Sequence, residues 1–334
     1  MANAGGRAAR VVRLPVHPSR KQIPLLSAAE VRRPAKVRRP RSFRAWRSRG
    51  GISTILFAVP ALIVFGYFSW GPIVSAVVMS FQKNNLVLPA TWVGFINFSY
   101  VLQDPLLPTA ALNTLYFTAL AILFGFPIPL FLAVFMSELR KRGWIYNVLA
   151  YLPVVIPPVV AILLWKVFYD PSARGLFNSI LGGIGLGPFS WLNSSASALP
   201  SIVLESTWSL AGGTVIIYLA ALTSVRAELY EAAELDGSGI WSRVWHITLP
   251  QIRGVILIML LLQIVGTMQV FTEPYLFTGG GPQNATTTIL LMIYNYAFVN
   301  GDIGAATALS VLLAAVLGLF SLVYQLVTRR WSND

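Results

Sequence analysis

Long apolar runs with few or no charged residues alternate with short polar segments along most of this chain. A helix needs roughly 20 mostly apolar residues to cross the hydrocarbon layer of a membrane. The runs lack the strict alternation of apolar and polar positions that a transmembrane barrel strand would show. The pattern therefore predicts an all-α polytopic membrane protein with six transmembrane helices, within residues 52–82, 105–137, 143–165, 201–224, 253–275 and 303–328.

Local composition refines two of these segments. The second helix is expected to occupy mainly residues 113–136 of its run. The third run contains Pro153, Pro157 and Pro158, and proline inside a helix removes a backbone hydrogen bond and bends the axis. Residues 169–200 are rich in Gly, Ser, Asn and Pro, and they are predicted to form a loop.

The bulk composition agrees with a membrane protein. Hydrophobic residues make up 56% of the 334 positions and charged residues only 11%, whereas a soluble domain carries about a quarter charged residues. The chain has no cysteine, which excludes disulfides and thiolate metal sites. Its only histidines, His17 and His246, are too few for a multi-histidine metal centre. We therefore expect no metal site.

The excess positive charge belongs to the N-terminal tail. Residues 1–50 hold 14 Lys and Arg against one acid, Glu30, while the rest of the chain holds 11 basic and 11 acidic residues. Such a basic, proline-containing segment is predicted to be a disordered cytoplasmic tail that touches anionic membrane lipid. A basic run alone would also suit a nucleic-acid-binding arm, but we expect no nucleic acid partner. The segment after the tail is too long for a signal peptide, so it is expected to remain as the first span.

The distribution of Lys and Arg predicts the orientation of the spans, because cytoplasmic loops are enriched in these residues. With the tail and the C-terminus both inside, the outer segments keep only three cations: Lys83, Lys166 and Arg174. The inner loops then hold the others: Arg140, Lys141, Arg142, Arg226, Arg243, Arg253, Arg329 and Arg330. The loop at 225–252, between the fourth and fifth helices, is therefore predicted to be cytoplasmic.

This loop has the pattern of two helices joined at a glycine corner. Ala, Leu and Glu, which favour helix, dominate residues 226–236. Asp236–Gly237 predicts the end of that helix, because glycine readily adopts the left-handed conformation of a C-terminal cap. Ser238 is expected to cap a second helix, and Pro250 suits the start of the next one. The loop is thus predicted to be a bent, rigid projection.

The first helix of the projection differs from an ordinary connector on the bilayer surface. It carries the acids Glu231 and Glu234 and a small apolar face that includes Ala232 and Ala233. A surface helix normally presents cations, and the anionic cytoplasmic leaflet would repel these carboxylates. The pattern therefore favours docking on a partner protein. In the second helix, one side is predicted to gather four apolar residues: Ile240, Trp241, Val244 and Trp245.

The stretch EAAELDGSGIWSRVWHITLP at 231–250 resembles the EAA motif of binding-protein-dependent ABC importer permeases, which is EAA, three residues, Gly, nine residues, I-x-L-P. Further stretches are similar to the carbohydrate-uptake branch, the MalF- and UgpA-like permeases: VGFINFSYVLQD, TGGGPQNATTTI and GDIGAATALS. The similarity covers about residues 52–330, and the basic tail departs from it. The motif residues implied to contact the ATPase are Glu231, Ala232, Ala233, Asp236, Gly237, Ile247, Leu249 and Pro250.

The resemblance implies a MetI/MalF-like transmembrane domain at 51–334, with its core at 105–330, in the bacterial plasma (inner) membrane. The chain would form half of a translocation pathway for a sugar, and a second homologous permease would form the other half. Two ATPase subunits would bind ATP and Mg, and an extracytoplasmic sugar-binding protein would deliver the cargo. The chain itself is expected to be neither an enzyme nor a cofactor carrier. No lysine here follows a glycine, so the P-loop sequence is absent.

Polar residues inside the spans are candidates for the substrate pathway, because such groups are costly in lipid and usually face a bundle interior. Gln263 and Thr267 share a helix face, four residues apart. The resemblance places sugar contacts in the fourth and fifth helices. The candidates are Trp208, Gly212, Gly213, Gln263, Thr267 and Gln269. The alternative is that these small and amide residues only pack the helices together.

Three rival functions are weighed against a sugar permease. A glycerol-phosphate-type ABC permease would call for a cation in the pathway, and none lies within spans four to six. An ion-coupled secondary transporter would need an intramembrane acid, but Glu205, Glu273 and Asp302 lie near predicted span ends. A membrane enzyme would need clustered acid–base groups, which the sequence does not show.

Overall fold

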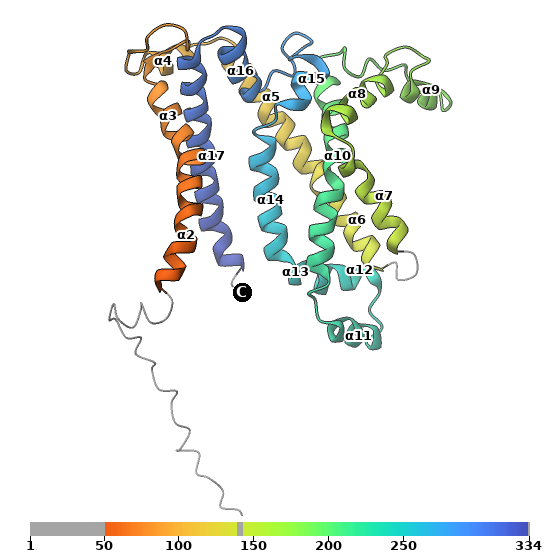
Figure 1. Ribbon diagram of the computed structural model, residues 1–334. Coiled ribbons are helices and arrows are strands. Elements are labelled where there is room, and N and C mark those ends of the chain that lie inside the picture. The colour runs from red at the N-terminus through yellow and green to blue at the C-terminus, as the bar shows by residue number, and fades with distance from the viewer. Residues whose placement is uncertain (1–50, 139–142, 333–334) are drawn as a thin grey trace, which may run out of the picture. The chain divides into compact units, whose positions relative to one another are not determined.

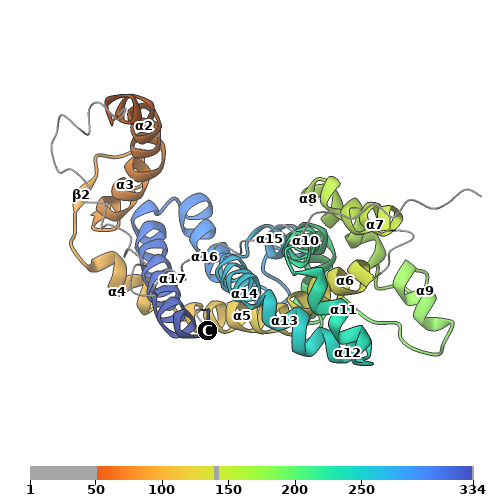
Figure 2. The same ribbon diagram turned by 90° about the horizontal axis from the view of Figure 1, so that it is seen from below.

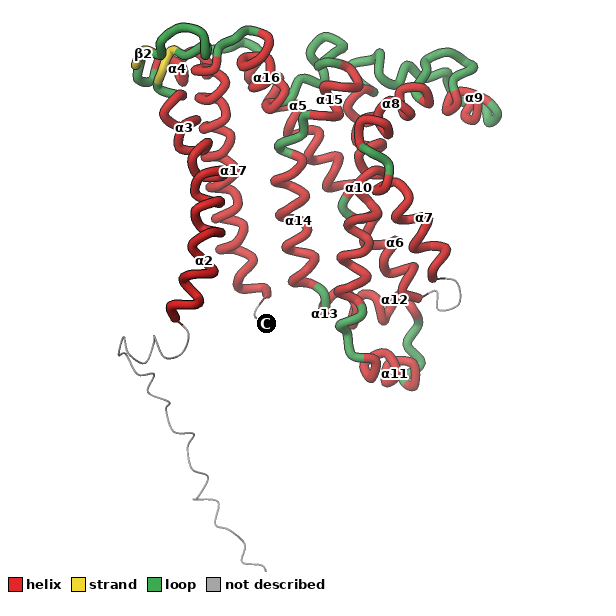
Figure 3. The backbone as a smooth tube through the Cα atoms, viewed as in Figure 1, coloured by secondary structure: helices red, strands yellow, loops and turns green. Residues whose placement is uncertain are grey.

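The computed structural model describes residues 51–138 and 143–332, and nearly all of its regular structure is helical (Figures 1 and 3). The tail at 1–50, predicted to be disordered, and the predicted inner loop at 140–142 lie outside the described residues. The chain divides into two units, of which the first ends at Ile63 and the second begins at Val64. Residues 51–63, the described part of the first unit, belong to helix α2 (Gly51–Phe65).

The second unit contains α-helices, π-helical turns (η) and one short hairpin. They follow in this order: η2 (Gly66–Trp70), α3 (Gly71–Met79), β1 (Gln82–Lys83), β2 (Thr91–Trp92), α4 (Ile96–Leu102), α5 (Leu107–Leu120), η3 (Ala121–Gly125), α6 (Pro127–Glu138), α7 (Gly143–Val155), α8 (Pro158–Phe168), α9 (Leu176–Gly182), α10 (Ala198–Leu222), α11 (Ala227–Leu235), α12 (Ile240–Arg243), η4 (Val244–Thr248), α13 (Leu249–Gln251), α14 (Arg253–Thr267), α15 (Thr272–Thr278), α16 (Ile289–Tyr294), η5 (Asn295–Val299) and α17 (Ile303–Ser332).

Four described helical segments are long and apolar enough to cross a membrane: Ser53–Met79, Leu107–Ser137, Ala198–Thr223 and Ile303–Arg329. Two bent pairs bring the number to six if each pair forms one span. These pairs are Val148–Val155 with Pro158–Phe168, bent by 101°, and Ile240–Gln251 with Arg253–Thr267, bent by 73°. The predicted all-α membrane architecture is confirmed, and the described part of the chain holds between four and six spans.

The predicted proline bend of the third span is present, and two other predicted segments differ from the structure. The third span breaks where Pro157 takes an extended conformation, because Pro158 can begin a helix but cannot continue one. The fifth predicted helix ends at Thr267 instead of 275, and α15 follows as a separate element. The predicted loop 169–200 contains helix α9, and Asn178 organises it by donating to the carbonyl oxygens of three residues: Asp170, Ser172 and Phe189.

Helix α10 is the central element of the second unit. It contacts α5, α6, α7, α8, α14 and α15. Gly212 makes the closest approach: a Cβ there would lie 2.2 Å from the carbonyl oxygen of Ala150 and 2.9 Å from Cγ2 of Val154, both in α7. Small residues allow such backbone contact between membrane helices, which have little hydrophobic drive to associate in lipid. The two helices therefore depend on a residue without a side chain at this position.

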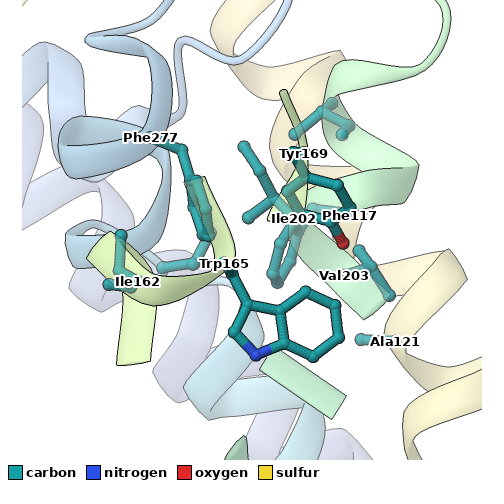
Figure 4. Close-up of a cluster of buried hydrophobic side chains, with 10 residues drawn as sticks. Phe117, Ala121, Ile162, Trp165, Tyr169, Ile202, Val203 and Phe277 are labelled. Carbon is teal, nitrogen blue, oxygen red and sulfur yellow. The ribbon is translucent and has the colours of Figure 1, made fainter. Parts of the chain in front are cut away.

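The largest aromatic part of the core lies around the N-terminal half of α10 (Figure 4). Trp165 and Tyr169, at the end of α8, pack with Ile202 of α10 and Phe277 of α15. The Tyr169 hydroxyl donates to the carbonyl oxygen of Ser201 at 2.7 Å. This buried contact fixes the end of the kinked α8 segment to α10.

The second unit has two different ends along its long helices. At one end lie β1, β2, α4, α9, α15 and α16, and we call this the hairpin end (Figure 1). At the other end lie α11, α12, η4 and α13, residues 227–251, which we call the elbow (Figure 1). Helix α14 leads away from the elbow and lies between α17 and α10 in both views (Figures 1 and 2).

The glycine pair in α10 gives a matched test of the α7–α10 contact. We expect Gly212→Ala to reduce the free energy of unfolding by about 1–3 kcal/mol, because the added methyl group overlaps the α7 backbone. Gly213→Ala meets open space, with nothing within 4 Å of its Cβ, and should stabilise the helix by about 1 kcal/mol. Thermal midpoints of the two purified variants in detergent would measure the difference. Equal midpoints would contradict this packing.

Candidate functional site

The predicted corner between two helices is present in the elbow. Helix α11 ends at Leu235, and Gly237 follows with a φ of +76°, the left-handed conformation that disfavours residues with a side chain. The predicted cap of the second helix is wrong by one residue. Gly239, not Ser238, precedes α12, and no side chain caps its first amides.

The residues of the EAA stretch occupy the open side of the elbow. Glu231, Ala232 and Asp236 are exposed, and Ala233 is half-buried. Leu235, beside them, is 90% exposed. The later motif residues Ile247 and Leu249 are half-buried instead, and Pro250 is exposed within the first turn of α13. The motif thus divides into an open part and a part that packs toward the bundle.

The second arm of the elbow, residues 240–251, has an apolar side that is only partly covered. Val244 is buried, whereas Ile240, Trp241 and Trp245 are more than half exposed. The four residues predicted to cluster on one side therefore differ in exposure, and only one of them is buried in the bundle.

Two side-chain bonds join α11 to the second arm. Nη1 of Arg243 donates to Oε1 of Glu234 at 2.6 Å. The hydroxyl groups of Tyr230 and Thr248 lie 3.0 Å apart and share a hydrogen bond. Beside these bonds is an open cavity of about 290 Å³ whose polar lining includes Glu231, Glu234 and Arg243.

The fourth and fifth predicted helices, α10 and α14, both contribute polar side chains that approach Gly125 of η3. A Cβ on Gly125 would lie 3.1 Å from Oγ1 of Thr207 and 3.4 Å from Nε2 of Gln263. Gly125 ends the π-helical turn η3, Thr207 belongs to α10 and Gln263 to α14. Turns of this type occur frequently at functional sites, because they widen the helix locally. Gly125 was not among the predicted pathway residues, and its only sequence signal was a glycine within an apolar run. Thr207 directly precedes the predicted candidate Trp208.

The other predicted pathway residues have different surroundings. The buried Thr267 hydroxyl donates to the carbonyl oxygens of Gln263 and Ile264 within its own helix. Gln269 follows the end of α14, is exposed and donates to the carbonyl oxygen of Val265. Trp208 packs against the aromatic cluster, with its ring 5.5 Å from that of Trp165. Gly212 is buried against α7, and Gly213 has open space around it.

Glu205 is a buried acid in α10. It was expected near the end of a span, yet only 1% of the residue is exposed. One carboxylate oxygen accepts a hydrogen bond from Ser209 Oγ at 2.6 Å. The burial follows from the longer α10, which begins at Ala198 and sets Glu205 two turns inside the helix.

The hairpin end carries polar groups but no metal cluster among the described residues. No group of three or more His, Cys, Asp or Glu that could hold a metal occurs in residues 51–138 and 143–332. Tyr296 donates a short hydrogen bond to Asp104. Burial, together with this carboxylate, raises the pKa of the Tyr296 hydroxyl, so the pair joins η5 to the loop after α4 as an uncharged donor and its acceptor.

Comparison with known proteins agrees with this architecture. Residues 125–333 match the family described as binding-protein-dependent transport system inner membrane component. The chain is 32% identical over 272 residues to the arabinooligosaccharides transport system permease AraP of Bacillus subtilis, covering 80% of this chain and 86% of AraP. It is also 32% identical to the sn-glycerol-3-phosphate transport system permease UgpA of Yersinia pseudotuberculosis over 280 residues, covering 82% of this chain and 94% of UgpA.

A solved structure shows the same fold. The crystal structure of a bacterial ABC transporter involved in the import of the acidic polysaccharide alginate contains a chain that is 30% identical, with a TM-score of 0.75. The match covers 86% of this chain and 99% of that one. The family match spans more than half of the sequence and includes both the elbow and the polar meeting point at Gly125. The chain therefore belongs to the family of binding-protein-dependent transport system inner membrane components.

Proposed function

We propose that this chain is one permease subunit of an ATP-driven importer for a di- or oligosaccharide. The elbow carries this proposal, because residues of the EAA-like stretch are exposed there, at the end of the bundle from which α10 and α14 extend. The name of AraP, which specifies arabinooligosaccharides, supports an oligosaccharide cargo.

A neutral cargo fits this chain better than a glycerol phosphate. Helices α10 and α14 contain no Lys or Arg beyond Arg253, the first residue of α14. A phosphate inside the membrane would need a cation or several donors aimed at it. The groups that meet at Gly125 are a hydroxyl and an amide, which suit sugar hydroxyls.

The proposed assembly places the elbow in the cytoplasm, together with both chain termini. A second homologous permease would complete the pathway, two ATPase subunits would hold ATP and Mg, and an extracytoplasmic binding protein would deliver the sugar at the hairpin end. The basic tail, residues 1–50, would lie against anionic lipid, and residues 51–334 would form the transmembrane domain. The distribution of Lys and Arg supports this orientation.

The elbow is proposed to act as the coupling element. Glu231 is exposed at the rim of the 290 Å³ cavity, where a cation of the ATPase could pair with it. The small side chains of Ala232 and Ala233 would let the ATPase approach the α11 backbone closely. The elbow continues through α13 into α14, which carries Gln263, so a displacement of α11 would reach the proposed pathway.

Charge reversal at the elbow should uncouple the importer. We expect Glu231→Lys to reduce transport at least about tenfold, because a repelled ATPase cation costs more than 1.4 kcal/mol of docking free energy. Gly237→Ala should have a smaller effect of the same kind, since its φ of +76° strains any residue with a Cβ. The measurement is sugar uptake and sugar-stimulated ATPase activity of the assembled transporter in liposomes.

Gly239→Ala is the matched control for the corner. Gly239 has a φ of −71° and nothing within 4 Å of its Cβ, so alanine should leave both activities unchanged. Normal transport and normal stimulated ATPase activity in Glu231→Lys would contradict the coupling role of the elbow.

The meeting point at Gly125 is proposed to line the sugar pathway. Among the predicted candidates, Gln263 is the residue whose amide approaches groups from two other elements, whereas the Thr267 hydroxyl bonds to its own helix. An amide can both donate to and accept from sugar hydroxyls. Gln263 is therefore the residue of α14 that we assign to the cargo.

Removal of this amide should weaken transport at low sugar concentration. We expect Gln263→Leu to raise the KM of uptake about fivefold, the loss of roughly 1 kcal/mol from one hydrogen bond. Gln269→Leu is the control, because Gln269 lies beyond the end of α14 and bonds to the backbone. Initial uptake rates over a range of sugar concentrations would measure both. Equal KM values in the two variants would reject the assignment of Gln263.

A further inference from the structure

The two arms of the elbow are joined by an ion pair between two positions that the EAA pattern leaves unspecified. Glu234 is in α11, and Arg243 is the last residue of α12, nine positions later. The side chain of Arg243 is only 10% exposed, and its Nη1 lies 2.6 Å from Oε1 of Glu234, whose side chain is 55% exposed. The pair therefore crosses the glycine corner between the two helices.

A second bond on the same face of α11 reinforces the first. Tyr230 and Glu234 are four residues apart, so their side chains are neighbours on one side of the helix. The Tyr230 hydroxyl bonds to that of Thr248 in η4, and Thr248 is 3% exposed. The Thr248 hydroxyl also donates to the carbonyl oxygen of Arg243 at 3.4 Å. The same face of α11 is thus held at two points by buried residues of the second arm.

The backbone bonds of the corner end at Ser238, because the amides of Gly237 and Ser238 donate to the carbonyl oxygens of Glu234 and Ala233. Residues 236–239 contain two glycines, Gly237 and Gly239, and a Cβ at either one would meet nothing within 4 Å. Glycine is the residue with the greatest backbone freedom, and open space offers no packing to restrain it. Beyond Ser238, the two side-chain bonds across the corner therefore restrain rotation of α11 against α12.

Because Arg243 is buried, its ion pair with Glu234 contributes more to stability than an exposed pair would. A buried guanidinium without a countercharge is strongly unfavourable, whereas exposed pairs contribute little. Arg243 is enclosed while Glu234 remains accessible at the wall of the 290 Å³ cavity. An α11 that swings away would break the 2.6 Å bond between Arg243 and Glu234, so this bond favours the closed corner over an open one.

We propose that Arg243 is a positioning residue that, through Glu234, locks α11 to the second arm, so that force applied to α11 moves α13 and α14 instead of bending the corner. This inference rests on the proposed coupling function of the elbow. It adds a role for a residue pair that makes no contact with the cargo and needs none with the ATPase.

The mechanical part of the proposal can be tested without any transport activity. The chain contains no cysteine, so Glu228→Cys and Ser242→Cys place two spin labels on exposed positions of the two arms. In the purified chain the distribution of distances between the labels should be narrow. Adding Arg243→Met should broaden it, and adding Arg226→Met should not, because Arg226 is an exposed arginine just before α11. Equal widths in all three proteins would overturn the lock.

The functional part is tested by the sugar transported per ATP hydrolysed in the assembled transporter. We expect Arg243→Met and Glu234→Ala each to lower this ratio about fivefold, within the range by which single residues alter coupling. Arg243→Lys, which keeps the charge, should recover most of the loss, and Arg226→Met should match the unmodified chain. A purely structural role would lower the amount of assembled transporter without changing the ratio, so an unchanged ratio in Arg243→Met and Glu234→Ala would reject the proposal.

The two possible failures are separable. If the unmodified transporter shows no ATP-dependent uptake of any sugar tested, the proposed function is wrong, while the distance measurement still decides whether the lock exists. If the unmodified transporter couples uptake to ATP and the Arg243→Met variant keeps the same ratio, the coupling function stands and the positioning role of Arg243 is wrong.

Discussion

The backbone contact between α10 and α7 at Gly212 is the constraint on which the rest of the bundle depends. Apolar side chains gain little by leaving lipid for one another, so membrane helices associate through close packing and a few polar bonds. At Gly212 the two helices approach so closely that even a methyl group does not fit. Because α10 also contacts α5, α6, α8, α14 and α15, its position determines that of most neighbouring helices.

The same helix connects the two ends of the second unit. Its hairpin end is fixed by the Tyr169 hydrogen bond and by the aromatic cluster around Trp165. Its middle contributes Thr207 to the meeting point with Gly125 and Gln263. Its other end leads into the elbow, which returns through α13 to α14. If the elbow and α10 are both rigid, a displacement of the elbow would also move Thr207 and Gln263 near Gly125. Coupled transport requires such a connection between the two regions.

The fold could be predicted from the sequence because the membrane permits few alternatives for a long apolar run. The glycine corner at Gly237 was also predictable, since its φ leaves room for little else. The capping residue was missed because Ser238 and Gly239 are adjacent, and the tertiary position of α12 decides between them. The early end of α14 at Thr267 and the meeting of Thr207 with Gln263 depend on long-range contacts, which no local pattern encodes. Glu234 and Arg243 are nine residues apart, a spacing that does not predict an ion pair. The two side chains meet only because the corner brings α11 and α12 together.

The π-helical turn at Ala121–Gly125 has a consequence for the whole of the segment that contains it. The amide of Phe126 bonds to the carbonyl oxygen of Ala121, five residues back, so one extra residue enters the turn. One residue corresponds to about 100° around a helix, and the angular phase of every later side chain shifts accordingly. Ala110, before the turn, packs with α16 and α17, whereas Ala133, after it, packs with α10 and the elbow. The side chains of this one span therefore face one group of helices before the turn and another group after it.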